Sequence, residues 1–452
     1  MTQQHIISQA QTPRALIIWR EMRKLTGLGF PIVISLAAAT LIGVVDTIMI
    51  APLGTLSLAA ASITNSVIII FYSGLYGFVS AVGVRMAEAR GKQSVDDLSS
   101  ATQTGVRIAI VAGILGATLM LMLRPALVHL GQPPEVLALL CGYWTAMSLL
   151  LIPFTIFYAL KGLFDAIDAP WVGVMLALAA VVLNIPANYI LIHGIGQWEG
   201  LGLVGAGIAS LLSQTASLVL AWIIWQRSKL TADARMKVAR NRQELRIQLK
   251  QGAAIATGYI GEGAAYAFAG LMMGWFSAVA LAANQIVSAV AGVLYMVPLG
   301  ISIAVSIRVG QAVGADERAR LVQIGIAALA VIIGWMTLVM AGLLAGGDYL
   351  ANALSDDAAV IKLATSMFIV IAAMQVADGV QGTMLGASRG MMDNFVPVGI
   401  TMISYWIIAL PIGYVLGFVW DWGPNGVWIG YGTGLGIAAI ATTYRFFTKV
   451  KA

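Results

Sequence analysis

Three carboxylates lie inside long apolar stretches of this 452-residue chain, namely Asp46, Glu262 and Asp378. An acidic group at the centre of a membrane-spanning helix costs about 2.5–3.5 kcal/mol on insertion scales. Such a group persists where it faces a protein-lined or watery cavity and binds a cation or a proton. No Lys or Arg occupies a similarly deep position, which argues against a purely structural ion pair and favours cations over anions as cargo.

Glu262 and Asp378 are expected at matching depth. A helical rise of 1.5 Å per residue places Glu262 about 17 Å, and Asp378 about 14 Å, from the cytoplasmic ends of their apolar stretches. Two carboxylates close together in a low dielectric resist double ionisation. Such a pair can hold a proton, a Na⁺ ion or a cationic substrate.

Asp46 is expected to lie beside amide side chains rather than beside a second acid. It lies about 28 Å along the first apolar stretch, while Asn184 and Asn188 lie about 21 and 27 Å along the fifth. The two asparagines are spaced i, i+4 and share a helix face. One carboxylate and two amide oxygens suit a hard cation such as Na⁺, and Pro186 between them can free a backbone carbonyl as a further ligand. The structural alternative is an asparagine that merely hydrogen-bonds across helices.

The composition places these residues in a membrane. Hydrophobic residues make up 60% of the chain and charged residues 10%, whereas a soluble domain carries about 25% charged residues. The basic residues lie in gaps between apolar blocks rather than on one face, so a nucleic-acid partner is not expected. The lipid bilayer is the expected surrounding.

Twelve apolar blocks are long enough to cross a bilayer as helices. They cover residues 27–52, 57–80, 104–123, 137–160, 170–192, 203–225, 251–275, 279–306, 321–345, 363–387, 396–418 and 426–446. With both termini in the cytoplasm, every Lys and Arg except Arg124 and Lys362 falls on the cytoplasmic side. The sequence therefore predicts an all-α, multi-pass protein of the bacterial cytoplasmic (inner) membrane.

A basic loop divides the chain into two halves of six spans. We expect a cytoplasmic N-terminal segment (1–26), an N-lobe (27–225), a cytoplasmic linker (226–250), a C-lobe (251–446) and a cytoplasmic tail (447–452). The linker contains eight basic residues and two acidic ones, Asp233 and Glu244. A protein partner is one explanation, and contact with anionic lipid headgroups is the one we favour.

The halves are related by a repeat. Residues 48–91 and 271–314 share 13 identities in 44 positions at a constant offset of 223, including Gly77 with Gly300 and Arg85 with Arg308. We interpret the two arginines as anchors at the cytoplasmic surface. Parallel six-helix repeats are typical of transporters, which bind substrate between repeats and rock them to alternate access.

Other chemistries are not indicated. The chain has no Walker motif or other Gly-rich phosphate loop, so neither an ATP-driven pump nor an enzyme is predicted. Cys141 is the only cysteine, which excludes an intrachain disulfide, and no metal-ligand spacing occurs among the three histidines. No cofactor is expected, and a monomer is the default.

Several motifs together resemble the multidrug and toxic compound extrusion (MATE) family and its NorM-like branch. The first span contains Val45-Asp46-Thr47-Ile48-Met49, and the fifth contains Asn184-Ile185-Pro186-Ala187-Asn188-Tyr189. The seventh contains Gly261-Glu262, the eighth closes with Pro298-Leu299-Gly300 and Arg308-Val309-Gly310, and the tenth contains Asp378-Gly379-Val380-Gln381 and Gly386-Ala387-Ser388-Arg389-Gly390. The resemblance covers about residues 20–446, and its specificity comes from the order and spacing of the whole set.

The resemblance implies two six-helix lobes in a V shape that export small organic cations in exchange for Na⁺ or H⁺. It implies an N-lobe cation site at Asp46, Asn184 and Asn188, with Ser210 as the hydroxyl of the sixth span. It also implies C-lobe acids at Glu262 and Asp378. Met374 stands where NorM-like members often have a tyrosine, which argues against a C-lobe Na⁺ site and leaves a proton or substrate role open.

We therefore predict a multidrug efflux antiporter that confers antibiotic resistance. One alternative is a flippase for lipid-linked or polysaccharide cargo within the same superfamily, although such proteins typically carry extra helices and a basic cavity. The other is a receptor or scaffold that does not transport, for which no ion dependence is expected.

Overall fold

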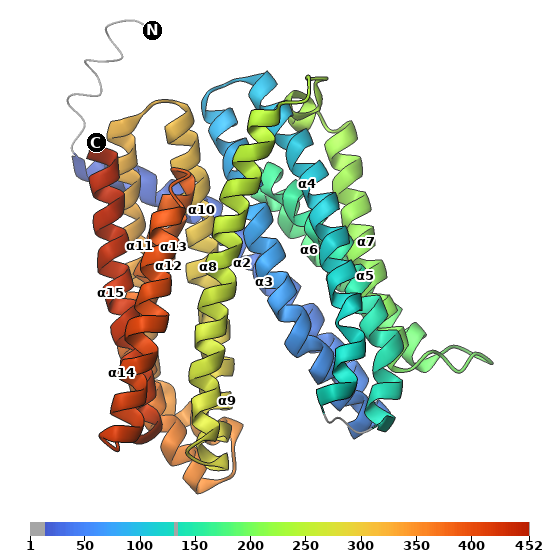
Figure 1. Ribbon diagram of the computed structural model, residues 1–452. Helices are drawn as coiled ribbons and strands as arrows, with labels where there is room; N and C mark the ends of the chain where they lie inside the picture. Colours follow the sequence, from blue (N-terminus) through green and yellow to red (C-terminus); the bar gives the residue numbers. More distant parts are fainter. Residues whose placement is uncertain (1–13, 131–133, 452) are drawn as a thin grey trace, which may run out of the picture. The chain divides into compact units, whose positions relative to one another are not determined.

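The computed structural model describes residues 14–130 and 134–451, and almost all of them are helical (Figure 1). Within those ranges the only β-type pairing is an isolated bridge between Ile195 and Trp198. The first half contains α2 (Arg14–Ile50), η1 (Ala51–Leu53), α3 (Thr55–Gly91), α4 (Val95–Met122), η2 (Arg124–Leu130), α5 (Pro134–Ala166), α6 (Pro170–His193), α7 (Leu203–Arg227) and η3 (Lys229–Arg235). The second half contains α8 (Arg242–Gly274), α9 (Ala278–Leu294), α10 (Met296–Gly314), α11 (Arg318–Leu354), α12 (Ala358–Gly390), α13 (Phe395–Met402), η4 (Ile403–Ala409), α14 (Leu410–Tyr414), η5 (Val415–Val419) and α15 (Gly423–Lys451).

Helices occupy all twelve predicted spans, which confirms the predicted all-α fold. The eighth span corresponds to α9 and α10 together, and the eleventh runs from α13 to η5. In the described part of the chain, ten of these segments are long and apolar enough to cross a membrane, while α8 and α15 are long but less apolar. The predicted linker, residues 226–250, contains η3 and the first turns of α8, with irregular structure at 236–241 between them. Residues 1–13 of the predicted N-terminal segment lie outside the described residues.

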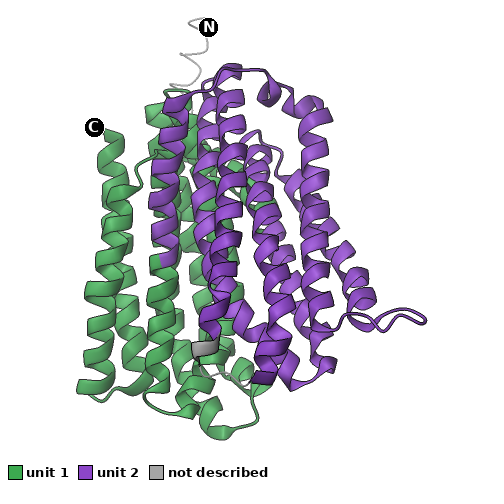
Figure 2. Cartoon of the chain, turned by 45° about the vertical axis from the view of Figure 1, so that its right-hand side comes forward, with its two compact units in different colours: residues 1–33, 261–452 green, residues 34–260 purple. Residues whose placement is uncertain are grey.

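The chain forms two compact units (Figure 2). Unit 1 comprises residues 1–33 and 261–452, and unit 2 comprises residues 34–260. Helices α2 and α8 therefore each begin in one unit and end in the other. The predicted lobe limits, 27–225 and 251–446, follow the repeat of the sequence and stay predictions.

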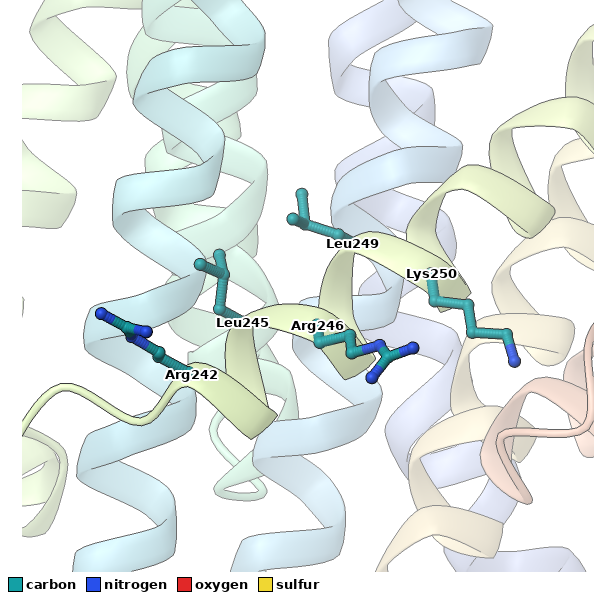
Figure 3. Close-up of a pocket in the computed structure, with 5 residues that line it drawn as sticks. All are labelled: Arg242, Leu245, Arg246, Leu249 and Lys250. Carbon is teal, nitrogen blue, oxygen red and sulfur yellow. The ribbon is translucent and has the colours of Figure 1, made fainter.

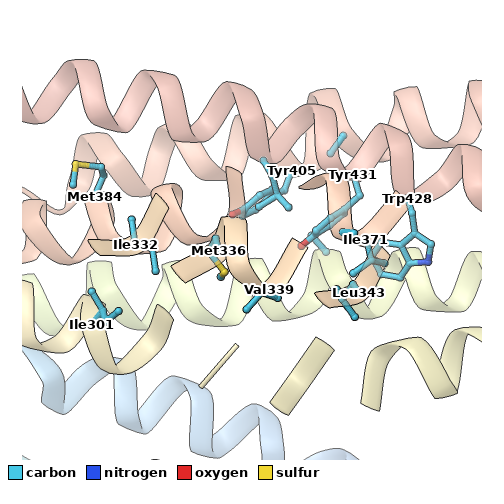
Figure 4. Close-up of a cluster of buried hydrophobic side chains, with 14 of the residues drawn as sticks. Ile301, Ile332, Met336, Val339, Leu343, Ile371, Met384, Tyr405, Trp428 and Tyr431 are labelled. Atoms are coloured by element: carbon cyan, nitrogen blue, oxygen red, sulfur yellow. The ribbon is translucent and has the colours of Figure 1, made fainter. Parts of the chain in front are cut away.

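Each unit has its own hydrophobic core. In unit 2, Tyr143 and Trp144 of α5 are almost fully buried, and the Trp144 indole donates to the backbone oxygen of Met120 across 2.9 Å. In unit 1, aromatic and aliphatic side chains from α10, α11, α12, η4 and α15 pack together (Figure 4). In a bilayer the lipid tails are as apolar as these side chains, so close van der Waals packing between the helices, rather than removal from water, holds each bundle together.

The repeated glycines mark a close approach between helices in each unit. In unit 2, a Cβ atom on Gly77 of α3 would lie 3.0 Å from the Cα atom of Ala256 in α8. In unit 1, a Cβ atom on Gly300 of α10 would lie 3.3 Å from the Cα atom of Val33 in α2. Ala256 is related to Val33 by the same offset of 223 residues, 256 minus 33, as Gly300 to Gly77. Each half thus holds the beginning of the other half's first helix.

The repeated arginines hold the same two helices by ion pairs. Arg85 donates from Nη2 to Glu244 Oε2 across 2.6 Å and from Nε to Glu244 Oε1 across 3.1 Å. Arg308 donates from Nη2 to Glu21 Oε2 across 2.9 Å. The two acids are also 223 residues apart, 244 minus 21. Arg85 and Arg308 therefore fasten α8 and α2, each on its own unit.

Candidate functional site

Asp46 lies at the centre of a buried polar cluster in unit 2, hereafter the Asp46 cluster, formed with Asn184, Asn188 and Ser210. Asp46 comes from α2, the asparagines from α6 and Ser210 from α7. Both asparagines are fully buried, and Asp46 and Ser210 are 9% and 6% exposed. The structure therefore brings together all four residues that the sequence and the family resemblance predicted for the N-lobe.

Hydrogen bonds fix the geometry of the Asp46 cluster. Asn188 donates from Nδ2 to Asp46 Oδ1 across 2.5 Å, and Ser210 donates its hydroxyl to Asp46 Oδ2 across 2.6 Å. Asn188 Nδ2 also donates to Asn184 Oδ1 across 3.0 Å. Because a buried carboxylate is costly unless its oxygens are paired, these donors make an ionised Asp46 tolerable in an apolar helix bundle.

One oxygen of the Asp46 cluster lacks a partner. Asn188 Oδ1 is buried and accepts no hydrogen bond from any described residue. A buried carbonyl oxygen without a partner costs roughly 1–3 kcal/mol, so this atom marks a position where a cation or a donor would be stabilised. Together, the carboxylate, the two amide oxygens and the hydroxyl form the oxygen-rich donor set that Na⁺ prefers.

The two C-lobe acids both lie in unit 1. Glu262 on α8 and Asp378 on α12 are both half-buried, and they are close enough to interact electrostatically. Arg389, at the end of α12, also lies within electrostatic range of Glu262. Arg389 itself lies two residues beyond the predicted tenth span (363–387), so the prediction that no Lys or Arg lies as deep as the acids stays a prediction. An arginine near one member of the pair leaves Asp378 as the acid with less electrostatic compensation.

An aromatic cluster adjoins the two acids, and the sequence did not predict it. Tyr405 and Tyr431 stack in parallel with ring centroids 5.7 Å apart, and Trp428 lies 5.6 Å from Tyr431 (Figure 4). Both tyrosines are within electrostatic range of Glu262 and Asp378. Tyr405 belongs to η4, a π-helical segment, and such segments are frequent at functional sites.

Met374 packs against Gly432 of α15, with its Cβ atom 3.1 Å from where a Cβ of Gly432 would lie. The phenols of Tyr266, Tyr405 and Tyr431 lie within electrostatic range of the acids, and none of them comes from this position of α12. One turn beyond Asp378, Gln381 is 1% exposed, and neither of its amide atoms has a partner among the described residues. No sequence signal separated these side chains from ordinary core residues.

No group of three or more His, Cys, Asp or Glu side chains gathers anywhere in residues 14–130 and 134–451. A transition-metal centre therefore has no candidate ligand set in that part of the chain. The carboxylates, amides, hydroxyls and aromatic faces of the two sites are suited to cation binding.

The model of the MatE family matches residues 31–190 and 239–415. The probable multidrug resistance proteins NorM of Bradyrhizobium diazoefficiens and Rhodopseudomonas palustris are each 31% identical to the chain. The first alignment covers 89% of this chain and 88% of the relative, and the second covers 98% and 95%. The chain belongs to the MATE family.

Solved transporter structures share the fold. The Vibrio cholerae MATE transporter VcmN in its bent form superposes with a TM-score of 0.88 at 19% identity, covering 96% of this chain and 98% of that one. A transporter of the MOP superfamily from Pyrococcus furiosus, described as having a binding pocket of reverse polarity, gives a TM-score of 0.86 at 18% identity and covers 96% of each chain. At these identities the likeness establishes the fold of this MATE protein, and its cargo must be argued from its own residues.

Proposed function

We propose that this MATE protein is a multidrug exporter that expels small organic, amphipathic cations from the cytoplasm in exchange for Na⁺ or H⁺. The single observation that carries the proposal is the Asp46 cluster, a buried carboxylate surrounded by amide and hydroxyl groups with one oxygen still unpaired. The NorM relatives, which are described as probable multidrug resistance proteins, support the same function.

The Asp46 cluster is the proposed site of the coupling ion. In the observed arrangement, Asp46 accepts hydrogen bonds from Asn188 and Ser210. A Na⁺ ion is bound by oxygen atoms and not by N–H groups. Its binding next to Asp46 therefore requires the Asn188 amide to turn, so that Oδ1 takes the place of Nδ2 beside the carboxylate. A proton needs no such change, because it binds directly to the carboxylate. The two ions therefore make different demands on Asn188.

Glu262, Asp378 and the aromatic cluster are the proposed site for the organic cation. Acidic groups attract its charge, and the faces of tyrosine and tryptophan rings attract cations and apolar surface alike. An anionic cargo would instead need basic groups in the same place. The acids therefore favour a cationic cargo over the lipid-linked or polysaccharide cargo of a flippase.

The proposed setting is the bacterial cytoplasmic membrane, with both termini in the cytoplasm and the protein acting as a monomer. The distribution of Lys and Arg along the sequence supports this orientation. Within unit 1, the beginning of α2 and the end of α15 lie at the same end of the bundle, as this orientation requires (Figure 1).

Ethidium uptake into inside-out vesicles tests the function and identifies the ion, because export from the cell corresponds to uptake in this orientation. A Na⁺ gradient, a pH gradient or no gradient is imposed on membrane vesicles that contain the protein. The accumulation of ethidium is then measured by its fluorescence. We expect uptake driven by one of the two ion gradients and no uptake with Asp46→Asn. Uptake that needs neither gradient, or that survives this substitution, would contradict the antiport proposal. The exposed acid Asp233, changed to Asn, is the matched control.

A further inference from the structure

The first turns of α8 carry a row of basic residues around a surface hollow of about 440 Å³. Its lining residues are Arg242, Leu245, Arg246, Leu249 and Lys250 (Figure 3). Arg242, Arg246 and Lys250 are spaced i, i+4, i+8 along the helix, and all five side chains are exposed. All of these residues belong to unit 2.

Arg242 and Arg246 have no acidic partner among residues 14–130 and 134–451. Cations are unfavourable near a helix N-terminus, because the helix dipole is positive there. The Asn241 side chain already caps the helix by accepting from the backbone amides of Gln243 and Glu244. Glu244 is the only acid in the first turn, and it faces inward to Arg85. An anion bound from outside would relieve this local excess of positive charge.

The leucines indicate that the anion is attached to an apolar chain. Leu245 and Leu249 are 40% and 43% exposed, and they project side by side from the helix (Figure 3). Arg246 and Lys250 extend from another side of the same turns. The predicted span begins at residue 251, so a rise of 1.5 Å places Arg246 about 8 Å from it, at the level of lipid headgroups. A free phosphate has no apolar part that could cover the two leucines.

We propose that the beginning of α8 is a binding site for one anionic phospholipid, whose phosphate contacts Arg242, Arg246 and Lys250 and whose acyl chain covers Leu245 and Leu249. The three basic side chains and the adjoining apolar pair match the two parts of such a lipid. Glu244 and Gln248 lie on the inward side of the same helix and bond to Arg85 and to the backbone oxygen of Ala101. The lipid would therefore hold α8 from outside while the ion pair holds it from inside.

Native mass spectrometry of the purified protein with added phosphatidylglycerol or phosphatidylcholine tests this site without any transport assay. We expect phosphatidylglycerol to be retained in preference to phosphatidylcholine. The double variant Arg242→Gln/Arg246→Gln should bind phosphatidylglycerol about thirty-fold more weakly, since each basic residue near an anionic lipid contributes roughly a factor of five. The matched control is Lys237→Gln/Arg240→Gln, which removes the same charge from exposed residues outside the hollow.

A second pair of variants separates lipid from phosphate. Leu245→Gln/Leu249→Gln should weaken phosphatidylglycerol binding while all the charges remain. If these variants bind the lipid normally and inorganic phosphate displaces it, the site is for free phosphate and the lipid assignment fails. Equal retention of both lipids by the unmodified protein would also overturn the proposal, as would equal losses in the arginine and control variants.

Discussion

The two halves are built alike at the ends that carry Arg85 and Arg308, whereas their interiors differ. Arg85 with Glu244 in unit 2 corresponds to Arg308 with Glu21 in unit 1, and both members of the pair are related by the same offset. The interior acids have no such counterparts. At the offset of 223, Asp46 corresponds to Ala269, a fully buried alanine.

Glu262 and Asn184 also lack a polar counterpart in the other half. Glu262 corresponds to Ala39 at the offset of 223, 262 minus 39. Pro186 and Pro411 set an offset of 225 for the fifth and eleventh spans, and there Asn184 corresponds to Ala409. Asp46, Glu262 and Asn184 therefore have no polar counterpart in the other half. Repetition has kept the contacts that assemble the bundle, while each half has its own chemistry: hydrogen-bonded oxygens in one and acids beside aromatic rings in the other.

The largest effect is expected from Asp46→Asn. Asparagine has the same shape and can still accept from Ser210, so the fold should remain, but the only charged ligand of the cluster is lost. We expect ion-driven ethidium transport to fall by on the order of a hundredfold. Size-exclusion chromatography should show unchanged protein. If Glu262→Gln abolishes transport while Asp46→Asn does not, the two interiors have exchanged the roles proposed here.

The next effect tests the repeated ion pairs. Arg85→Ala leaves Glu244 buried, with Gln248 as its remaining side-chain hydrogen-bond partner among the described residues. An uncompensated buried charge costs about 3–5 kcal/mol. Arg308→Ala should cost less, because Glu21 keeps Arg320 at 3.3 Å. Thermal unfolding in detergent should therefore show a larger drop in Tm for the first variant.

The double variant Arg85→Gln/Glu244→Gln is the control for this comparison, because it removes both charges and leaves two amides that can pair. It should recover most of the lost Tm. Equal drops for Arg85→Ala and Arg308→Ala would show that the extra basic neighbour of Glu21 contributes nothing. A Tm for the double variant as low as that of Arg85→Ala would show that the loss is not due to an uncompensated charge.

The predictable parts of the site are those whose chemistry conflicts with their surroundings. Asp46, Asn184 and Asn188 stand out because polar residues in an apolar run need a reason, and helical rise alone placed Asp46 and Asn188 at similar depth. Tyr405 and Tyr431 do not stand out, since an aromatic residue in an apolar run looks like core. The π-helical segment η4 could not be predicted from the sequence either. A hydrophobic block looks the same whether or not one turn of its helix contains an extra residue.

The fold shows a similar division. The twelve spans follow from composition, but the exchange of first helices between units does not. Glu21 and Arg308 are separated by 287 residues, and each alone looks like a solvated residue at a helix end. The repeat itself gave the only hint, since it matched Gly77 with Gly300 and Arg85 with Arg308 without saying what they contact.

A moderate effect is expected from Asp378→Asn. Removal of one carboxylate from the acid pair weakens attraction for an organic cation but leaves Glu262 and the aromatic cluster in place. We expect the Kd for ethidium, measured by fluorescence anisotropy in detergent, to rise about tenfold. The exposed acid Asp348, changed to Asn, should have no effect. If ethidium binding were unchanged and ion coupling were lost, the coupling ion would bind at the C-lobe pair. Both interiors would then take part in ion coupling.

The smallest effect concerns the aromatic cluster and decides how it contacts the cargo. Tyr431→Phe keeps the ring that stacks on Tyr405 at 5.7 Å and removes only the hydroxyl. If the ring face attracts the cation, the Kd for ethidium should change by less than about threefold, whereas Tyr431→Ala should raise it about tenfold. A loss with Tyr431→Phe as large as that with Tyr431→Ala would mean that the phenol oxygen, and not the ring, contacts the cargo. The C-lobe interior would then bind through oxygens, as proposed for the Asp46 cluster, and the contrast between the two halves would be one of degree.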